Sequence, residues 1–273
     1  MKKYVLISSV FVCFILLIVL IVTNKKSIDK KFITVDTLYS FLYNENQKIE
    51  IEIYINDDEF PLLEKNIYND FKLHDEKYKK NLSLELVDVT YSHSEMLNNE
   101  YFHKYIFKFK MPNLTSDYSI EEAILDISFM NNNKISLKIG DLSLMYIESE
   151  SEIKWISIDS KKNDPSDLQI SQIRIELEQI ITNIDTISIY PESNLKYSYI
   201  GNTLIIDLLK YDLVCNYIPI IIKTKDKQIY TISNHRFLIE YNILENAGKR
   251  LNIYDFNWFD KCWKEILESK NFF

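Results

Sequence analysis

The side chains of this chain best suited to metal binding or nucleophilic chemistry are four histidines and two of its three cysteines. The histidines are His74, His93, His103 and His235. None are spaced as HExxH or HxH, the patterns that bring two imidazoles to one metal. His93 and His103 could face each other as a metal pair if their segments form a hairpin. The alternative is that all four are surface or half-buried residues without a metal.

Cys215 and Cys262 are the two cysteines that follow the apolar N-terminal segment. In an oxidising compartment they could form a disulfide. They could equally be two buried thiols, because cysteine is among the most buried residue types. A nucleophilic pair of either cysteine with His235 rests on residue type alone. The chain contains no CxxC, which excludes zinc ribbons and thioredoxin-type sites at the level of motifs.

Glycine is scarce, with only Gly140, Gly201 and Gly248 in the chain. Loops that bind phosphate need glycine so that backbone N–H groups can approach the ligand. No GxGxxG, GxxxxGK[ST] or GxSxG can be written here. This excludes Walker-type NTPases, dinucleotide-binding Rossmann enzymes and the usual serine-hydrolase elbow.

Codon usage explains part of this shortage. The chain has 42 isoleucines, 24 asparagines, and 29 lysines against three arginines. Ile, Asn and Lys rise together in AT-rich genomes, while Ala, Gly and Arg fall. The composition therefore suggests a low-GC Gram-positive source, with an AT-rich eukaryote as the alternative.

Two acidic clusters offer oxygen ligands of the kind that Ca²⁺ prefers. They are residues 57–59, and Asp159, Asp164 and Asp167 within one loop. Neither matches DxDxDG, and the glycine that an EF-hand loop needs is missing. A helix cap and a solvated turn explain them more simply. The sequence therefore assigns no catalytic residue, no metal ligand and no cofactor-binding residue.

Residues 4–23 form an uncharged run rich in Leu, Ile, Val and Phe. As a helix this run spans about 30 Å, the thickness of the hydrocarbon core. A signal-peptide apolar region is shorter, about 7–15 residues, and ends in small residues, which residues 21–24 do not provide. The sequence predicts an uncleaved signal anchor, with a cleaved signal peptide as the alternative.

Two arguments about the orientation of this anchor point in opposite directions. Lys2 and Lys3 precede the run, and four lysines follow it within residues 25–31. The cation count alone slightly favours a cytoplasmic C-terminal part. Long domains, however, translocate largely regardless of flanking charge. We expect a single-pass membrane protein with the bulk of the chain extracytoplasmic, and the cytoplasmic orientation is the alternative.

The chain beyond the anchor is acidic. Without Lys2 and Lys3 the 32 basic residues fall to 30, against 40 acidic ones, so the net charge is near −10. Such a field makes nucleic acid and anionic membrane poor partners.

Strand patterns dominate the rest of the sequence. Isoleucines at 49, 51, 53 and 55 alternate with Glu50, Glu52 and Tyr54, which predicts a half-buried strand with one wet face. Further strands are predicted at 82–91, 101–111, 142–147, 153–158, 186–190 and 237–243. Hairpins are predicted at 123–139, 195–208 and 217–233, with turns at 131–133, 201–202 and 225–227.

Two segments show helical spacing. Phe60, Leu63, Ile67 and Phe71 predict a helix over 59–79. Residues 173–184 fit a helix and a strand equally well.

The C-terminal residues 255–269 predict an amphipathic helix. Trp258, Phe259 and Trp263 lie on its apolar face. This face could pack against the second β-rich domain, or these three residues could dock a partner.

These patterns together predict a mainly β fold, with α+β as the alternative. Residues 1–31 are the transmembrane anchor and its basic flank. A charged, serine-rich stretch at 148–153 divides a first β-rich domain, 32–149, from a second, 150–252. Both are expected to be antiparallel Ig-like β-sandwiches, or parts of one, with one or two accessory helices. Residues 253–273 are the C-terminal amphipathic helix.

The functional hypothesis is a membrane-anchored, extracytoplasmic binding or assembly module at the cell envelope. Its partners would be the membrane, through residues 4–23, and a protein or envelope polymer. The 19 tyrosines favour it, because tyrosine suits interfaces. The alternative is an envelope hydrolase whose carboxylates or histidines meet only in the fold. A third is a receptor-like sensor that works through a membrane partner.

Overall fold

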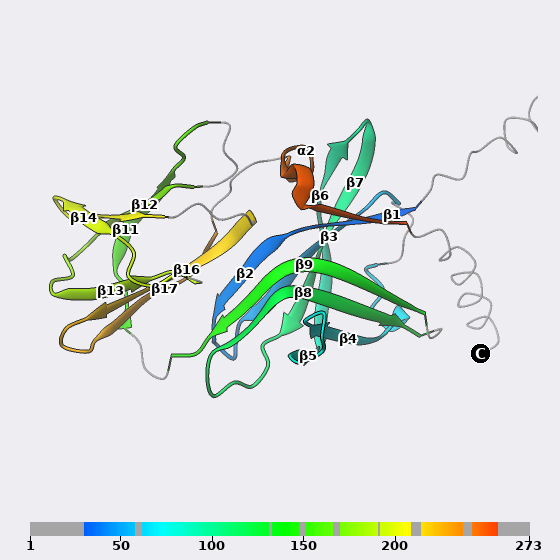
Figure 1. Ribbon diagram of the computed structural model, residues 1–273, viewed down its shortest axis with the longest axis horizontal. Helices are drawn as coiled ribbons and strands as arrows, with labels where there is room; N and C mark the ends of the chain where they lie inside the picture. The colour runs from blue at the N-terminus through cyan, green and yellow to red at the C-terminus, as the bar shows by residue number, and fades with distance from the viewer. Residues whose placement is uncertain are drawn as a thin grey trace, which may run out of the picture. The chain divides into compact units, whose positions relative to one another are not determined.

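The computed structural model describes residues 30–57, 62–130, 133–147, 151–165, 170–190, 192–208, 214–236 and 242–255. This part of the chain is mainly β, as predicted (Figure 1). Among the residues described, no helix is long and apolar enough to cross a membrane. The segment predicted as the anchor, 4–23, lies outside them.

Within the described residues the strands form three sheets. The first has the order β18-β1-β3-β7-β6. Its strands are β18 (Leu251–Asp255), β1 (Lys31–Val35), β3 (Lys48–Ile55), β7 (Glu100–Lys110) and β6 (Leu86–Leu97). All pairs in this sheet are antiparallel.

The second sheet has the order β10-β17-β16-β2-β9-β8-β4-β5, and β13 also pairs with β16. Its strands are β10 (Ser151–Glu152), β17 (Ile229–Arg236), β16 (Val214–Thr224), β2 (Thr37–Leu42), β9 (Lys134–Met145), β8 (Tyr118–Phe129), β4 (Tyr68–His74), β5 (Asn81–Leu84) and β13 (Ile184–Ser188). Here β2 is parallel to both β9 and β16, and β10 is parallel to β17.

The third sheet has the order β11-β12-β15-β14 and is antiparallel. Its strands are β11 (Trp155–Lys161), β12 (Gln172–Leu177), β15 (Thr203–Asp207) and β14 (Tyr197–Ile200). Residues 173–177, which also fitted a helix, are thus a strand. The domain boundaries at 31, 149 and 252 remain predictions, although β2 and β16 pair across the second of them.

The isoleucine strand is confirmed as β3, and all four of its isoleucines are fully buried. Its expected wet face is wrong, because Glu52 and Tyr54 are buried as well. Tyr54 is covered by the short helix α2 (Ile243–Ala247), whose Leu244 and Ala247 pack in one apolar cluster with it, and Glu52 is paired with Lys104 of β7. Both faces of β3 are therefore covered from Ile51 onward, while Glu50 is half-buried.

The helix predicted over 59–79 is wrong. The described part of this segment holds a 3₁₀ turn, η1 (Lys65–Ile67), followed by β4. β4 pairs with both β5 and β8, and Phe71 and Leu73 point into the core while Leu63 is exposed. Two hydrogen-bonded neighbours outweigh a helical spacing of four apolar residues.

The predicted hairpins are present. β8 pairs with β9, β14 with β15, and β16 with β17. Gly201 and Lys227 take the positive φ angles, 61° and 67°, that these last two turns require. The strands expected at 134–139 and 142–147 are one strand, β9, which continues through Gly140.

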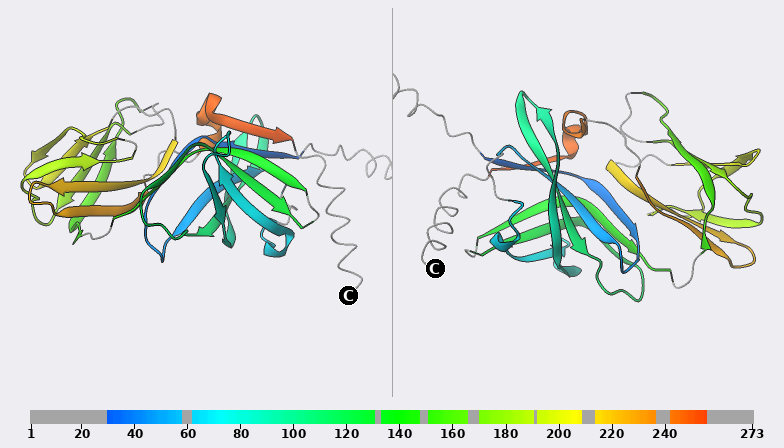
Figure 2. Two further views of the ribbon diagram at one scale, coloured as in Figure 1. Left: turned by 60° about the horizontal axis from the view of Figure 1, so that its bottom comes forward. Right: turned by 180° about the vertical axis from the view of Figure 1, so that it is seen from behind.

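The chain returns to the first sheet at its last described strand, since β18 pairs with β1 and Asp255 lies opposite Lys31. A 3₁₀ turn, η2 (Gly248–Arg250), precedes β18. Asp255 is thus a strand residue, and the rest of the helix predicted over 255–269 lies outside the described residues. Figure 2 shows α2 and β18 together with the hairpin of β6 and β7 from two further sides.

Candidate functional site

The hairpin of β6 and β7 carries two of the four histidines, and a β-bulge interrupts it. The pairing breaks between Tyr91 and Ser94. Ser92 and His93 therefore stand opposite one residue of β7, Lys104. A bulge of this kind bends its strand and redirects the side chains next to it.

One side of the hairpin holds a buried ion pair. Lys104 Nζ lies 2.7 Å from Glu52 Oε2 on β3, and the two side chains are 1% and 9% exposed. The ammonium also lies 5.5 Å from the ring centroid of Tyr54, a cation–π contact. Removing either charge would leave the other uncompensated in the interior. The pairing of β3 with β7 should therefore be sensitive to the loss of either charge.

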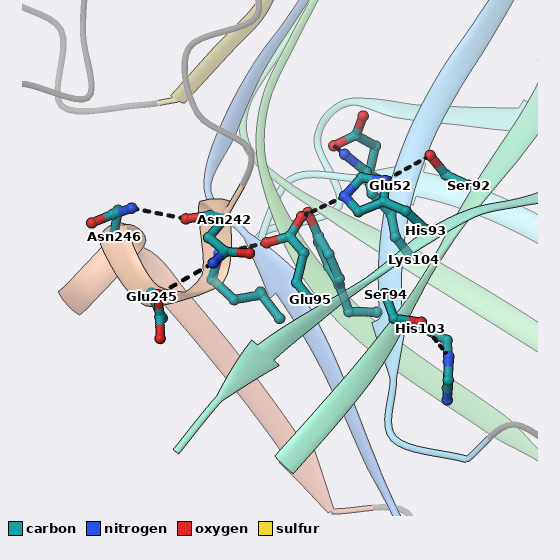
Figure 3. A network of polar contacts seen from close by, with 12 residues as sticks. Glu52, Ser92, His93, Ser94, Glu95, His103, Lys104, Asn242, Glu245 and Asn246 are labelled. Atoms are coloured by element: carbon teal, nitrogen blue, oxygen red, sulfur yellow. Dashed lines mark hydrogen bonds and ion pairs between the residues drawn. The ribbon is translucent and has the colours of Figure 1, made fainter. Parts of the chain in front are cut away.

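Glu95 on β6 is the central acceptor of the polar network in Figure 3 and is 1% exposed. Its Oε1 accepts hydrogen bonds from the Tyr54 hydroxyl at 2.9 Å and from His93 Nε2 at 3.0 Å. Its Oε2 accepts the backbone N–H of Leu244 at 2.9 Å. Three donors replace the water that a buried carboxylate loses. The Leu244 bond also ties α2 to the hairpin.

Burial raises the pKa of Tyr54 well above its usual value, and the nearby charges of Glu52 and Glu95 raise it further. The phenol therefore stays protonated and serves as a donor to Glu95. Its ring packs with Phe102 and Leu244 in the apolar cluster under α2.

His93 connects this buried carboxylate to a serine at the surface. Ser92 Oγ lies 2.9 Å from His93 Nδ1, and His93 Nε2 lies 3.0 Å from Glu95 Oε1 (Figure 3). A carboxylate only accepts, so Nε2 carries a hydrogen, and in the neutral imidazole Nδ1 is then an acceptor. Ser92 is then the donor to Nδ1. The order of groups is hydroxyl, imidazole and carboxylate, the order found in nucleophilic relays.

A second serine–histidine pair lies across the same hairpin. Ser94 Oγ is 2.8 Å from His103 Nδ1 and 3.0 Å from the Tyr91 hydroxyl. Ser94 and Glu95 are adjacent in a strand, so they point to opposite faces. In the part of the chain that the structure describes, no carboxylate is bonded to His103, and this pair lacks the third member of the relay.

Three large apolar side chains stand exposed on the hairpin: Tyr91 at 50%, Met96 at 38% and Tyr101 at 65%. Met96 lies directly opposite Tyr101 in the register. Tyr91 reaches the same side, because its hydroxyl contacts Ser94, two residues before Met96. Tyr91, Met96 and Tyr101 are called the hairpin face below.

His74 belongs to a different buried group. Its Nδ1 lies 2.7 Å from the carbonyl oxygen of Asp75, and its Nε2 lies 3.0 Å from Asp126 Oδ2. Both partners are hydrogen-bond acceptors, and the imidazole bridges them. Ser136 Oγ and Lys134 Nζ each lie 2.6 Å from Asp126. The serine here contacts the acid and not the imidazole, so this group joins strands and forms no relay.

The structure brings His93 and His103 onto one hairpin, as the sequence suggested, but each imidazole is bonded to a different serine. The described residues contain no group of three or more His, Cys, Asp or Glu side chains placed to hold a metal. His235 lies on β17 against Trp155, with ring centroids 6.0 Å apart. Burial lowers the pKa of His235.

Several residues singled out from the sequence lie outside the described part. They include Cys262, Asp167 and the proposed docking residues Trp258, Phe259 and Trp263. Of Cys215 only the backbone is described. The disulfide, the cysteine–histidine pair and the docking role remain predictions.

The sequence did not identify Glu95, Ser92, Lys104 or Tyr54 as residues of a site. The only local signal was the run Tyr-Ser-His-Ser-Glu at 91–95. Regular alternation would place Ser92 on the face opposite His93 and Glu95. The bulge that brings the three together depends on the pairing with β7.

No protein-family model matches the chain, and no curated protein matches it either. Among solved structures, it is similar to SGBP-B of the Bacteroides ovatus mixed-linkage glucan utilization locus in complex with a heptasaccharide. The identity is 10%, the match covers 74% of this chain and 43% of that one, and the TM-score is 0.22. The chain thus spans less than half of that protein.

Two further solved structures are similar to a comparable degree. A marsupial T cell receptor is 11% identical, with 74% of this chain and 99% of that one covered and a TM-score of 0.23. The fibronectin(III)-like modules of Clostridium thermocellum CbhA are 8% identical, with 74% and 90% covered and a TM-score of 0.18. TM-scores this low do not establish a shared fold, and they carry no ligand over to this chain.

Proposed function

We propose that this chain is a binding module of the cell envelope that holds a protein partner through its hairpin face. In this proposal residues 4–23 anchor it in the membrane. Its β-rich part is Ig-like and lies outside the cytoplasm. The observation that carries the proposal is the exposure of Tyr91, Met96 and Tyr101 on one face of a hairpin whose other face is locked by buried polar contacts.

The chemistry of this face favours a protein over nucleic acid or a charged surface. The cores of protein interfaces are enriched in tyrosine and methionine and depleted of charge. The hairpin face has two tyrosines, one methionine and no charged member. The net charge near −10 beyond the anchor also opposes binding to nucleic acid.

Rigidity supports the same assignment. Lys104, Glu52 and Glu95 are buried and bonded across β3, β6, β7 and α2. A face held in one conformation loses little entropy when a partner binds. The polar network therefore has a role in binding without touching the partner.

Site-specific photo-crosslinking in intact cells tests the proposal. A photoreactive phenylalanine analogue placed at Tyr101 should link to one protein, whose purified form binds the full chain. Met96→Lys should weaken that binding by about 10-fold or more, as expected for a change at the centre of an interface.

Tyr78 is the matched control, because it is 54% exposed but lies between β4 and β5. A photoreactive residue there should not yield the same product. Equal yields from positions 78 and 101, or binding unaffected by Met96→Lys, would contradict the hairpin face as the binding surface.

Protease treatment of intact cells tests the proposed location separately. Digestion of the part beyond residue 31 is expected, while the anchor stays with the membrane. Protection of that part from protease would place it in the cytoplasm and overturn the extracytoplasmic assignment.

A further inference from the structure

We propose that Ser92, His93 and Glu95 form a nucleophilic relay that cleaves an exposed carboxylic ester by transferring its acyl group first to Ser92 and then to water. This activity goes beyond binding and does not depend on the hairpin face having a partner. Its basis is the bonded sequence of hydroxyl, imidazole and carboxylate at the bulge of β6 (Figure 3).

The buried carboxylate sets the tautomer that a general base needs. Glu95 accepts from His93 Nε2, so the free lone pair of the ring is on Nδ1, 2.9 Å from Ser92 Oγ. Heavy-atom distances of about 2.6–3.2 Å are those from which a base can take a proton. The two ring nitrogens have exchanged roles relative to the serine-protease triad. In that triad Nε2 faces the serine, whereas here Nδ1 does. The proton transfer itself is the same.

Glu95 is well held for this role. Its Oε2 is bonded to Leu244 N–H, and its Oε1 is shared by Tyr54 and His93. Because it is 1% exposed, its charge is little screened by water and can stabilise the imidazolium that forms when Ser92 loses its proton. Glu95 is thus a positioning residue, and Ser92 and His93 would contact the substrate.

The substrate must bring its ester to the surface of the protein. Ser92 is exposed and the His93 side chain is 45% exposed. In the described chain, these residues do not line the cavities of about 340, 380 and 490 Å³, which lie elsewhere. The geometry therefore fits acyl groups that project from their carrier, such as O-acyl esters on a polymer or on a small alcohol.

The two steps balance. Ser92 Oγ forms a bond to the acyl carbon, and its proton passes to His93 Nδ1. The ester C–O bond breaks, and the leaving alcohol takes that proton. Water then attacks the acyl-serine, His93 accepts and returns one proton, and the carboxylic acid leaves with Ser92 restored. The net reaction is ester plus water to acid plus alcohol.

A fluorophosphonate probe on the full-length chain tests the proposal, because serine displaces fluoride from it only when activated. Wild-type protein should be labelled at residue 92, as read by peptide mass spectrometry. Ser92→Ala should abolish labelling. His93→Gln should slow it by about 100-fold or more, the usual share of general-base assistance. Circular dichroism establishes that each variant is folded.

Ser94→Ala is the matched control, since Ser94 contacts a histidine that lacks a carboxylate partner. It should leave labelling of Ser92 unchanged. Folded wild-type protein that resists the probe, or equal labelling of Ser92→Ala, would overturn the relay.

Glu95→Gln separates a positioning role from a structural one. The amide can donate to His93 Nε2, which moves the ring hydrogen to Nδ1 and removes the base. Nitrogen NMR of His93 should show the Nε2–H tautomer in wild type and the Nδ1–H tautomer in the variant, with labelling about 100-fold slower or more, because general-base assistance is lost. A changed tautomer with undiminished labelling would exclude Glu95 from the relay.

Discussion

At the scale of single residues, the distinctive feature is that charge lies inside the first sheet. Lys104, Glu52 and Glu95 are all buried, and each is bonded to a group on another strand or on α2. Burying a charge is costly unless a partner compensates it. These side chains should therefore tolerate substitution much less well than the surface charges of the same strands.

Lys104→Met tests this point, because it keeps the apolar stem and removes the ammonium from Glu52. We expect a loss of about 3–5 kcal/mol in the free energy of unfolding. The control is Lys110→Met, also on β7, whose ion pair with Glu85 spans 3.7 Å between side chains 62% and 74% exposed. That variant should lose no more than about 1 kcal/mol. Equal losses for the two variants in urea titrations would mean that breaking the buried pair costs no more than breaking the exposed pair.

His235 gives a prediction for the dependence of stability on pH. Burial lowers the pKa of His235 in the folded chain. On acidification the unfolded chain therefore takes up this proton first, beginning near its usual pKa of about 6.5. The free energy of unfolding should fall as the pH drops below that value, until the folded form is protonated too. Urea midpoints at pH 7.5 and 5.5 should differ less in His235→Gln than in wild type, and an equal difference would assign the effect to other groups.

At the scale of elements, one glycine of β9 allows the parallel pairing of β9 with β2 in the second sheet. Gly140 has a φ of 102°, and a Cβ there would come within 2.3 Å of the backbone N and O of Thr37 on β2. The parallel pairing of β2 with β9 therefore requires glycine at this position. Gly201 also has a positive φ, but the space around it is open.

Alanine at the two positions should separate conformational strain from collision. Gly201→Ala should cost about 1–2 kcal/mol, the strain of a left-handed residue. Gly140→Ala should cost about 3 kcal/mol or more, because backbone atoms of β2 must also move. Thermal unfolding of both variants measures the difference. A cost at position 140 no greater than at 201 would show that β2 can shift to make room for the added methyl group.

At the scale of the whole described chain, the first and last strands are neighbours. β1 and β18 are antiparallel, with Lys31 opposite Asp255 and Thr34 opposite Asn252. The sheet that carries the hairpin therefore closes only after the chain has passed through the other two sheets. The hydrogen bond from Leu244 to Glu95 spans 149 positions in the same way.

A disulfide tests this closure. Directly opposed residues of antiparallel strands have Cα atoms about 4.5–5.5 Å apart, within the range that a disulfide bridges. Lys31→Cys combined with Asp255→Cys, in a chain with the native cysteines replaced by serine, should give a cross-linked 31–255 peptide pair on oxidation. The control pairs Lys31→Cys with Lys249→Cys and should give little product. Equal cross-linking in both would contradict the register.

The sequence by itself determined the class of the fold and most of its turns. Isoleucine at every second position buries one face of a strand, and residues 201–202 and 225–227 supply turn geometry where they are expected. These are local properties, so one sequence suffices to predict them. The helix expected over 59–79 failed, because helical spacing is also local and β4 obtains partners on both sides.

Only the tertiary structure decided which distant segments cover the second face of a strand. Tyr54 looked like part of the wet side of β3 until α2, some 190 positions later in the chain, covered it, and Glu52 looked so until Lys104 of β7 paired with it. Ser92, His93 and Glu95 meet because β7 forces a bulge into β6. Burial and bulges depend on contacts between distant segments, so the residue pattern within one strand does not predict them.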